Sequence, residues 1–143
     1  MGYGVPAGVA AKIACPQRTV LAFSGDGDFL MNGQELATAM QYRAAVKFLV
    51  VNNGMYGTIR MHQERDFPAR VWGTALQNPD FAALARAYGL HGETVTRTAD
   101  FAPALERCLR HDDPTLMELV IDPEAITTST TLEKIRSAAL AKK

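Results

Sequence analysis

The stretch TVLAFSGDGD, residues 19–28, joins a short apolar run to a turn that is rich in glycine and aspartate. Residues 19–23 favour a buried parallel strand, because strand-forming apolar residues follow one another without polar alternation. The stretch VKFLVVNNG, residues 46–54, has the same arrangement, with an apolar run that ends in Asn52-Asn53-Gly54. Two strands that each end in a turn predict a parallel sheet with helical crossovers.

The rest of the chain alternates between helical and extended patterns. Helices are predicted over residues 6–14, 32–40, 57–64, 81–88, 101–111 and 132–140, and further strands over residues 93–95 and 115–121. Asn32 and Glu35 suggest a capping box at the start of their helix. Residues 65–77 are predicted to be irregular, with Trp72 filling the core or, as the less favoured alternative, covering a pocket. The alternation predicts an α/β protein of the three-layer α/β/α class with a mostly parallel sheet, as a single domain over residues 1–143.

Composition and charge argue against several classes of protein. The 143 residues are 48% hydrophobic, and 15 basic residues balance 15 acidic ones to a formal net charge of zero. We expect no nucleic-acid partner without a basic surface, and no membrane partner without an apolar run near the roughly 18 residues of a span. Cys15 and Cys108 lack metal-ligand spacing and no export signal opens the chain, so a cytoplasmic protein with reduced thiols is expected. Because the first residues already belong to a glycine-rich turn, we expect a piece of a longer protein.

Asp26 and Asn53 each come just after a predicted strand. The carboxyl ends of parallel strands meet at one edge of a sheet, so both side chains are expected there. Mg²⁺ prefers oxygen ligands and commonly takes one or two from protein, with the rest from phosphate and water. One carboxylate and one amide oxygen therefore suit a Mg²⁺ ion that holds a diphosphate. The groups expected to approach the phosphate oxygens are Gly25, Gly27 and the backbone N–H groups of Asp28 and Phe29.

Other interpretations of these motifs stay open. Gly-Asp-Gly or Asn-Asn-Gly alone is typical of an ordinary turn. An EF-hand loop does not fit, because Leu30 and Met31 stand where that loop needs an acceptor and a glycine. Residues 2–7 fit the G-x-G-x-x-A dinucleotide fingerprint, which requires a preceding strand that the sequence does not show. A nicotinamide dinucleotide domain is therefore a weaker alternative.

Taken together, the two turns and their spacing resemble the signature of thiamine-diphosphate enzymes. In the C-terminal, diphosphate-binding domain of that family, Gly-Asp-Gly is followed by a couple of dozen residues and then Asn-Asn. Here residues 25–27 are followed by 24 residues and then Asn52-Asn53. The segments MGYGVPA (residues 1–7) and FLMNGQELA (residues 29–37) also resemble the acetolactate synthase group. The resemblance implies the thiamine-diphosphate-binding fold and a C-terminal fragment of a longer enzyme.

The resemblance also implies a cofactor, a metal and the residues that bind them. Thiamine diphosphate would be anchored by Mg²⁺, with Asp26, the side-chain oxygen of Asn53 and the backbone carbonyl of Met55 as protein ligands. Met1 falls where the family places an apolar residue under the thiazolium ring. The complete expected cofactor-binding set is Met1, Gly25, Asp26, Gly27, Asp28, Phe29, Asn53, Met55, Tyr56 and Gly57.

No catalytic residue is expected in this chain. The family activates the cofactor with a glutamate from a pyrimidine-binding domain, usually on a partner subunit, and no segment here resembles that domain. Glu35, Glu64 and Glu93 are interpreted as a capping or surface residue, a helix-end charge and a loop charge. Arg60 and His62 are candidates for lining the substrate pocket, or else they belong to a solvated helix face.

The resemblance therefore implies one half of an active site that acts on 2-keto acids by decarboxylation or carboligation. The expected partners are a pyrimidine-binding domain, from the same chain or another, and further copies of the chain in a homodimer or tetramer. The alternative is a truncated module that binds the cofactor or serves assembly without catalysis.

Overall fold

The computed structural model describes residues 1–142, which form two compact units. The first unit combines Met1–Asn52 with Asn78–Val120. The second unit combines Asn53–Gln77 with the residues from Ile121 onward. Among the residues described, no helix is both long enough and apolar enough to span a membrane.

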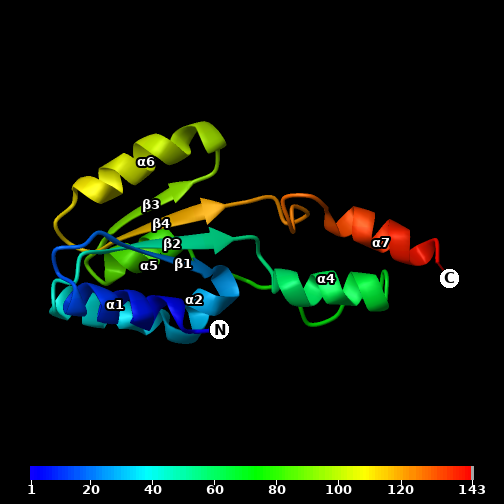
Figure 1. Cartoon of the computed structure of the whole chain (residues 1–143), viewed down its shortest axis with the longest axis horizontal. Coiled ribbons are helices and arrows are strands. Elements are labelled where there is room, and N and C mark those ends of the chain that lie inside the picture. The colour runs from blue at the N-terminus through cyan, green and yellow to red at the C-terminus, as the bar shows by residue number, and fades with distance from the viewer. Residues whose placement is uncertain (143) are drawn as a thin grey trace. The chain divides into compact units, whose positions relative to one another are not determined.

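The first unit is built on a four-stranded parallel sheet (Figure 1). Its strands are β1 (Val20–Gly25), β2 (Val46–Asn52), β3 (His91–Val95) and β4 (Thr115–Val120), in the spatial order β1-β2-β4-β3. Gly25 of β1 is in register with Val51 of β2, and Asn52 of β2 with Val120 of β4. The carboxyl ends of these three strands therefore lie side by side, at the edge where ligands of open parallel sheets bind.

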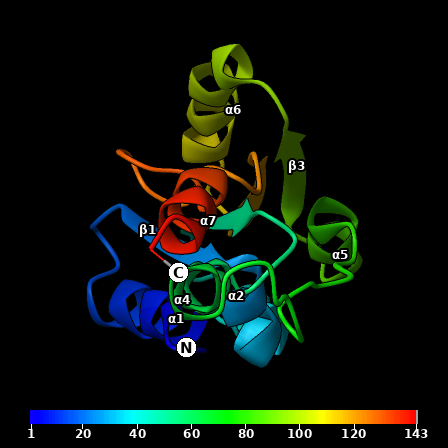
Figure 2. The same ribbon diagram turned by 90° about the vertical axis from the view of Figure 1, so that its right-hand side faces the viewer.

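Helices cover both faces of this sheet. One face carries α1 (Gly4–Ala14) over β1 and β2, and α5 (Phe81–Ala87) over β3 and β4. The opposite face carries α6 (Thr98–Arg110), which packs on β3 and β4 (Figure 2). The first unit is thus a three-layer α/β/α structure with a parallel sheet, and the predicted fold class is confirmed.

Two hydrophobic clusters fill the space between the layers. In the cluster under α1 and α5, the rings of Phe29 and Phe81 meet edge to face, with centroids 5.3 Å apart. This edge-to-face contact is a preferred geometry for aromatic rings. The cluster under α6 is made by Leu49, Val95, Ala104, Cys108 and Met117. Because β2 supplies residues to both clusters, its sequence is apolar on both faces, as expected for a central parallel strand.

The helix predicted to start at Asn32 begins earlier and is broken into pieces. The pieces are α2 (Asp26–Asn32), which starts where β1 ends, a 3-10 turn (Gly33–Glu35) and α3 (Leu36–Gln41). Asn32 makes no capping bond, and its Nδ2 donates instead to the backbone carbonyl of Gly2. Glu35 accepts a hydrogen bond from the hydroxyl of Thr38. The predicted capping box is therefore wrong, because both side chains have other partners.

The second unit contains α4 (Gly57–Asp66) and α7 (Leu132–Leu140), which pack against each other. The segment that follows α4 returns to the start of the unit. Ala75 in this segment pairs with Met55 in an antiparallel bridge. Trp72 lies in this returning segment with 84% of its surface exposed. The prediction that Trp72 fills the core is therefore wrong.

Candidate functional site

Asp26 is a buried carboxylate at the carboxyl edge of the sheet. It is only 2% exposed, because α2 begins at this residue and turns its side chain into the first unit. Its Oδ1 accepts the backbone N–H of Gly27 at 2.9 Å, and its Oδ2 accepts Nδ2 of Asn78 at 2.7 Å. Both of these donors are neutral, and they fix the orientation of the carboxylate. A buried anion held in this way is well suited to a cation.

The turn around Asp26 leaves room for a ligand. Gly25, the residue before α2, has an extended backbone, and a Cβ built on it would meet no atom of residues 1–142 within 4 Å, its chain neighbours excepted. Asp28 and Phe29 point elsewhere: the Asp28 carboxylate accepts the N–H of Gly2 at 2.5 Å, and the Phe29 ring is buried. The side chains of both residues are thus engaged within the first unit.

Gly2, which lies before α1, makes two hydrogen bonds to side chains of α2. Gly2 donates its N–H to Asp28 and accepts Nδ2 of Asn32 on its carbonyl at 2.6 Å. The positive φ of Gly2, 75°, is needed for this turn. Met1, the residue expected to lie under a thiazolium ring, is 71% exposed and directly precedes this anchor.

Asn78 is a member of the site that the sequence did not reveal. It lies two residues before Asp80, the N-cap of α5, whose carboxylate accepts the N–H of Ala83. The Nδ2 of Asn78 also donates to Oδ1 of Asn52 at 2.9 Å. The two ends of the sequence signature, Asp26 and Asn52, are thus joined by a residue that lies 26 positions after Asn52.

Asn53 and Met55 open the second unit and are close to each other there. The Oδ1 of Asn53 accepts the N–H of Met55 at 3.2 Å, and Gly54 between them has a positive φ of 68°. A Cβ on Gly57 would lie 2.8 Å from Nδ2 of Asn53 and 2.9 Å from Cδ1 of Ile126. Glycine at this position therefore allows the Asn53 amide to pack against the first turn of α4.

The pocket candidates Arg60 and His62 lie on α4. His62 is exposed, whereas Arg60 donates two hydrogen bonds to Oε1 of Glu64, at 3.0 and 2.6 Å. Glu64 is 1% exposed and also accepts Arg136 at 2.9 Å and the N–H of Ala69. The hydrogen bond from Arg136 is the main reason why the pKa of Glu64 falls to about 2. The interpretation of Glu64 as a helix-end charge is therefore wrong, because it is the buried centre of an ion-pair network.

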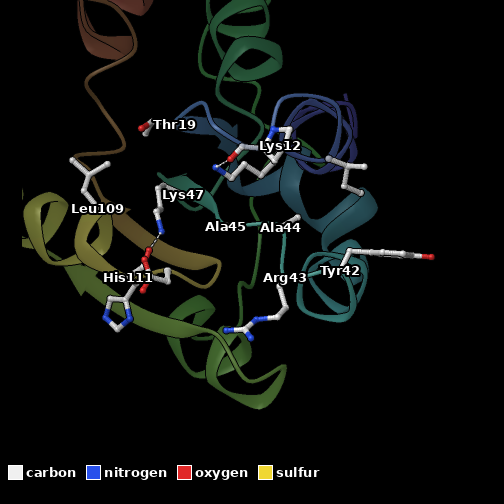
Figure 3. A pocket seen from close by; sticks show the side chains of 12 residues that line it. Lys12, Thr19, Tyr42, Arg43, Ala44, Ala45, Lys47, Leu109 and His111 are labelled. Atoms are coloured by element: carbon white, nitrogen blue, oxygen red, sulfur yellow. Dashed lines mark hydrogen bonds between the residues drawn. The ribbon is translucent and has the colours of Figure 1, made fainter.

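A cavity of about 510 Å³ lies at the opposite, amino edge of the sheet (Figure 3). It is lined by basic side chains, but its amines already serve backbone carbonyls. Lys47 donates to the carbonyls of His111 and Asp113, and Lys12 donates to those of Pro16 and Arg18. Burial lowers the pKa of Lys47, which further weakens any attraction for an anion. The lysines at this edge thus stabilise chain segments that follow helices.

His91, Glu93 and Cys108 bring three potential metal-ligating atoms within 4.8 Å of one another. Glu93, which lies in β3 and not in the expected loop, is paired with Arg107, and this guanidinium lowers the pKa of the Glu93 carboxyl. Burial raises the pKa of the Cys108 thiol. A cation would have to displace the arginine and a thiol proton, so the cluster is better suited to structure than to metal binding.

Comparisons with known proteins show to which family the chain is related. The family model described as "Thiamine pyrophosphate enzyme, C-terminal TPP binding domain" matches residues 1–119. The acetolactate synthase isozyme 2 large subunit of Escherichia coli (strain K12) is 39% identical, over 94% of this chain and 26% of that protein. An acetolactate synthase of Arthrospira platensis is 40% identical, over 83% of this chain and 21% of that protein.

A solved structure supports the same relationship. The thiamine diphosphate-dependent 4-hydroxybenzoylformate decarboxylase of Rhodococcus jostii RHA1 matches with a TM-score of 0.80 and 34% identity, over 85% of this chain and 23% of that one. The chain thus spans about a quarter of the length of the proteins it resembles. By the match of its sequence to the family over residues 1–119, the chain belongs to the thiamine pyrophosphate enzymes and corresponds to their C-terminal TPP-binding domain.

Proposed function

We propose that this chain binds the diphosphate of thiamine diphosphate through Mg²⁺, with residues 1–143 acting as one diphosphate-binding domain. The observation that carries the proposal is the buried carboxylate of Asp26 at the carboxyl edge of the sheet, oriented by neutral donors. The proposed metal ligands are Asp26, the side-chain oxygen of Asn53 and the backbone carbonyl of Met55. The residues proposed to contact the cofactor are the same ten that the sequence resemblance implies.

The chemistry of the donor set fits this group. A single carboxylate with neutral oxygens is suited to Mg²⁺ that already faces the negative oxygens of a diphosphate, whereas a second carboxylate would add repulsion. The space beside Gly25 allows a ligand to approach the backbone. The chain's own residues thus supply anchorage and a fixed electrostatic environment, and the bound cofactor would supply the nucleophilic carbon for chemistry on 2-keto acids.

We further propose that the chain is part of an acetolactate synthase-like lyase or transferase that decarboxylates or joins 2-keto acids. The curated relatives named above are acetolactate synthases, which supports this reaction class. The activating glutamate would come from a pyrimidine-binding domain, and the assembly would be a homodimer or tetramer in the cytoplasm. Arg60 and His62 remain candidates for the substrate pocket.

A module without catalysis is the second candidate function. None of the three glutamates named in the sequence analysis is placed to activate the cofactor, because each has another partner. Glu35 bonds to Thr38, Glu64 to two arginines and Glu93 to Arg107. A chain that acts alone would therefore bind cofactor without activating it. Adding a pyrimidine-binding domain from an acetolactate synthase and assaying carbon dioxide release from pyruvate separates the two candidates.

The binding proposal is tested by calorimetry with thiamine diphosphate, with and without Mg²⁺, on wild type and Asp26→Ala. We expect heat of binding from the wild type only when Mg²⁺ is present, and none from the variant. Glu106→Gln, at an exposed position on α6, is a matched control that removes a carboxylate elsewhere and should bind as the wild type does. Equal heats for wild type and Asp26→Ala would refute the proposed metal site.

A further inference from the structure

A chain of side-chain hydrogen bonds runs along the carboxyl edge of the sheet and reaches all four strands. Asn78 Nδ2 donates to Asp26 and to Oδ1 of Asn52, as described above. The Nδ2 of Asn52 in turn donates to Oε1 of Glu118 at 2.7 Å. The hydroxyl of Thr94 donates to Oε2 of Glu118 at 3.0 Å. This series of hydrogen bonds thus begins just after β1, crosses β2 and β4, and ends on β3.

The two carboxylates at either end set the direction of the amides between them. Glu118 accepts hydrogen bonds on both of its oxygens, one of them from Nδ2 of Asn52, so Oδ1 of Asn52 points towards Asn78. Because Oδ1 of Asn52 accepts a hydrogen bond, Asn78 turns its Nδ2 group towards it. The same Nδ2 group also donates to Asp26. Each amide has one orientation that satisfies both neighbours, and a flip of either one would place two donors or two acceptors face to face.

Burial makes this arrangement costly to disturb. Glu118 is 5% exposed although it carries a carboxylate, and both of its oxygens are used by the partners just named. The Oδ1 of Asn78 is buried and has no hydrogen-bond partner among the described residues. An unpaired buried acceptor is unfavourable, and the two bonds that Asn78 donates oppose this cost.

We propose that Asn78, Asn52 and Glu118 are positioning residues that hold the Asp26 carboxylate in the orientation that binds the metal. The inference rests on the proposed function, because it takes Asp26 as a ligand of Mg²⁺. Asn78 acts directly on Asp26, and Glu118 acts from three hydrogen bonds away by fixing the Asn52 amide. Asn52, the first residue of the Asn-Asn pair, thereby has a role distinct from that of Asn53. Groups that orient a metal ligand typically contribute about 10- to 100-fold to metal affinity.

The first measurement uses the metal-free protein. In an ¹⁵N–¹H spectrum, both Nδ2 protons of Asn78 are expected to exchange slowly with solvent, because each serves one acceptor. Glu118→Gln keeps the shape of the side chain but removes its charge, so the hydrogen bond that Asn52 donates to it loses its charge-assisted strength, and the Asn78 signal should shift and exchange at least about tenfold faster. Glu106→Gln should leave that signal unchanged. An unchanged Asn78 signal in Glu118→Gln would overturn the inference.

The second measurement follows Mn²⁺, as a spectroscopic substitute for Mg²⁺, by electron paramagnetic resonance in the presence of thiamine diphosphate. We expect Asn78→Ala and Glu118→Gln to weaken Mn²⁺ binding about 10- to 100-fold while urea unfolding still shows a folded protein. If Glu118→Gln does not fold, Thr94→Val removes one donor at the far end of the chain of bonds and should give a smaller change in the same direction.

The outcomes separate the inference from the function on which it rests. If Asp26→Ala binds Mn²⁺ as the wild type does, or if the wild type binds none, the proposed function fails, and the Asn78 spectrum of the metal-free protein still decides the inference. If wild type binds, Asp26→Ala does not, and both Asn78→Ala and Glu118→Gln bind as the wild type does, then only the inference fails.

Discussion

Replacing Glu64 by glutamine is expected to loosen the second unit. Glu64 is almost fully buried, and its carboxylate accepts Arg60 Nη2 at 2.6 Å and Arg136 Nη2 at 2.9 Å. The Arg136 bond is the largest cause of a pKa that is lowered from 4.5 to about 2. At about 1.4 kcal/mol for each tenfold change in acidity, folding favours the ionised carboxylate by about 3 kcal/mol.

The variant Glu64→Gln removes this charge and leaves two guanidinium groups with a poorer partner. We therefore expect a loss of about 3 kcal/mol, which is within the range observed when one partner of a buried ion pair is removed. The wild type makes a related prediction. Because the folded pKa of Glu64 lies below the unfolded value of 4.5, its contribution is fully present above about pH 4.5 and is lost as the pH falls towards 2.

Hydrogen exchange followed by mass spectrometry measures the loss of stability in α4 and α7, the two helices that the Glu64 network joins. Backbone amides of α4 and α7 in Glu64→Gln are expected to exchange on the order of 100-fold faster than in the wild type at neutral pH, whereas β2 and β4 serve as an internal reference. The exposed pair of Glu106 and Arg110 provides the control, since Glu106→Gln should change exchange less than about twofold. A change below about threefold in α4 and α7 of Glu64→Gln would show that the network does not hold these helices.

Three further substitutions or reagents probe close contacts and buried groups. Gly8→Ala should destabilise the first unit by about 1–3 kcal/mol in urea unfolding, because its Cβ would lie 2.8 Å from a Cβ on β1. Gly57→Ala should weaken Mg²⁺-dependent binding of thiamine diphosphate in calorimetry, because its Cβ would press on Nδ2 of Asn53. An unchanged affinity would argue against Asn53 as a metal ligand. A thiol reagent should label the exposed Cys15 rapidly and Cys108 only on unfolding, since Cys108 is buried and its pKa is raised by burial; equal labelling rates would contradict the packing under α6.

The fold was predictable because its signals are local. The apolar runs that became β1 and β2 are short and end in turns, and β2 is apolar on both faces because two cores need it. Asp26 could be identified for the same reason, since a residue that follows a buried strand by position must lie at the carboxyl edge. Residues whose position follows from the strand pattern could therefore be predicted from the sequence.

Residues whose role depends on distant partners were not found. Asn78 follows no strand, and its contacts to Asp26 and Asn52 span 52 and 26 positions of the chain. Glu64 stands in a polar helix and is buried only because Arg136, 72 positions later, packs against it. The prediction for Trp72 was wrong in the opposite sense, because it expected burial. Large aromatic residues are buried on average, but Trp72 lies on the segment that follows α4 and is exposed there.

The carboxyl edge of the sheet places two buried carboxylates at the ends of one hydrogen-bond chain, and only one of them is suited to a metal. Glu118 lies within β4, and its two oxygens accept donors from the neighbouring strands β2 and β3. Asp26 lies one residue beyond β1, next to the open space at Gly25. The amides between them are neutral and can transmit orientation but not charge. The inner carboxylate therefore acts as a fixed acceptor that aligns the amides, so replacing Glu118 should change the orientation of Asp26, the carboxylate that we propose as the metal ligand.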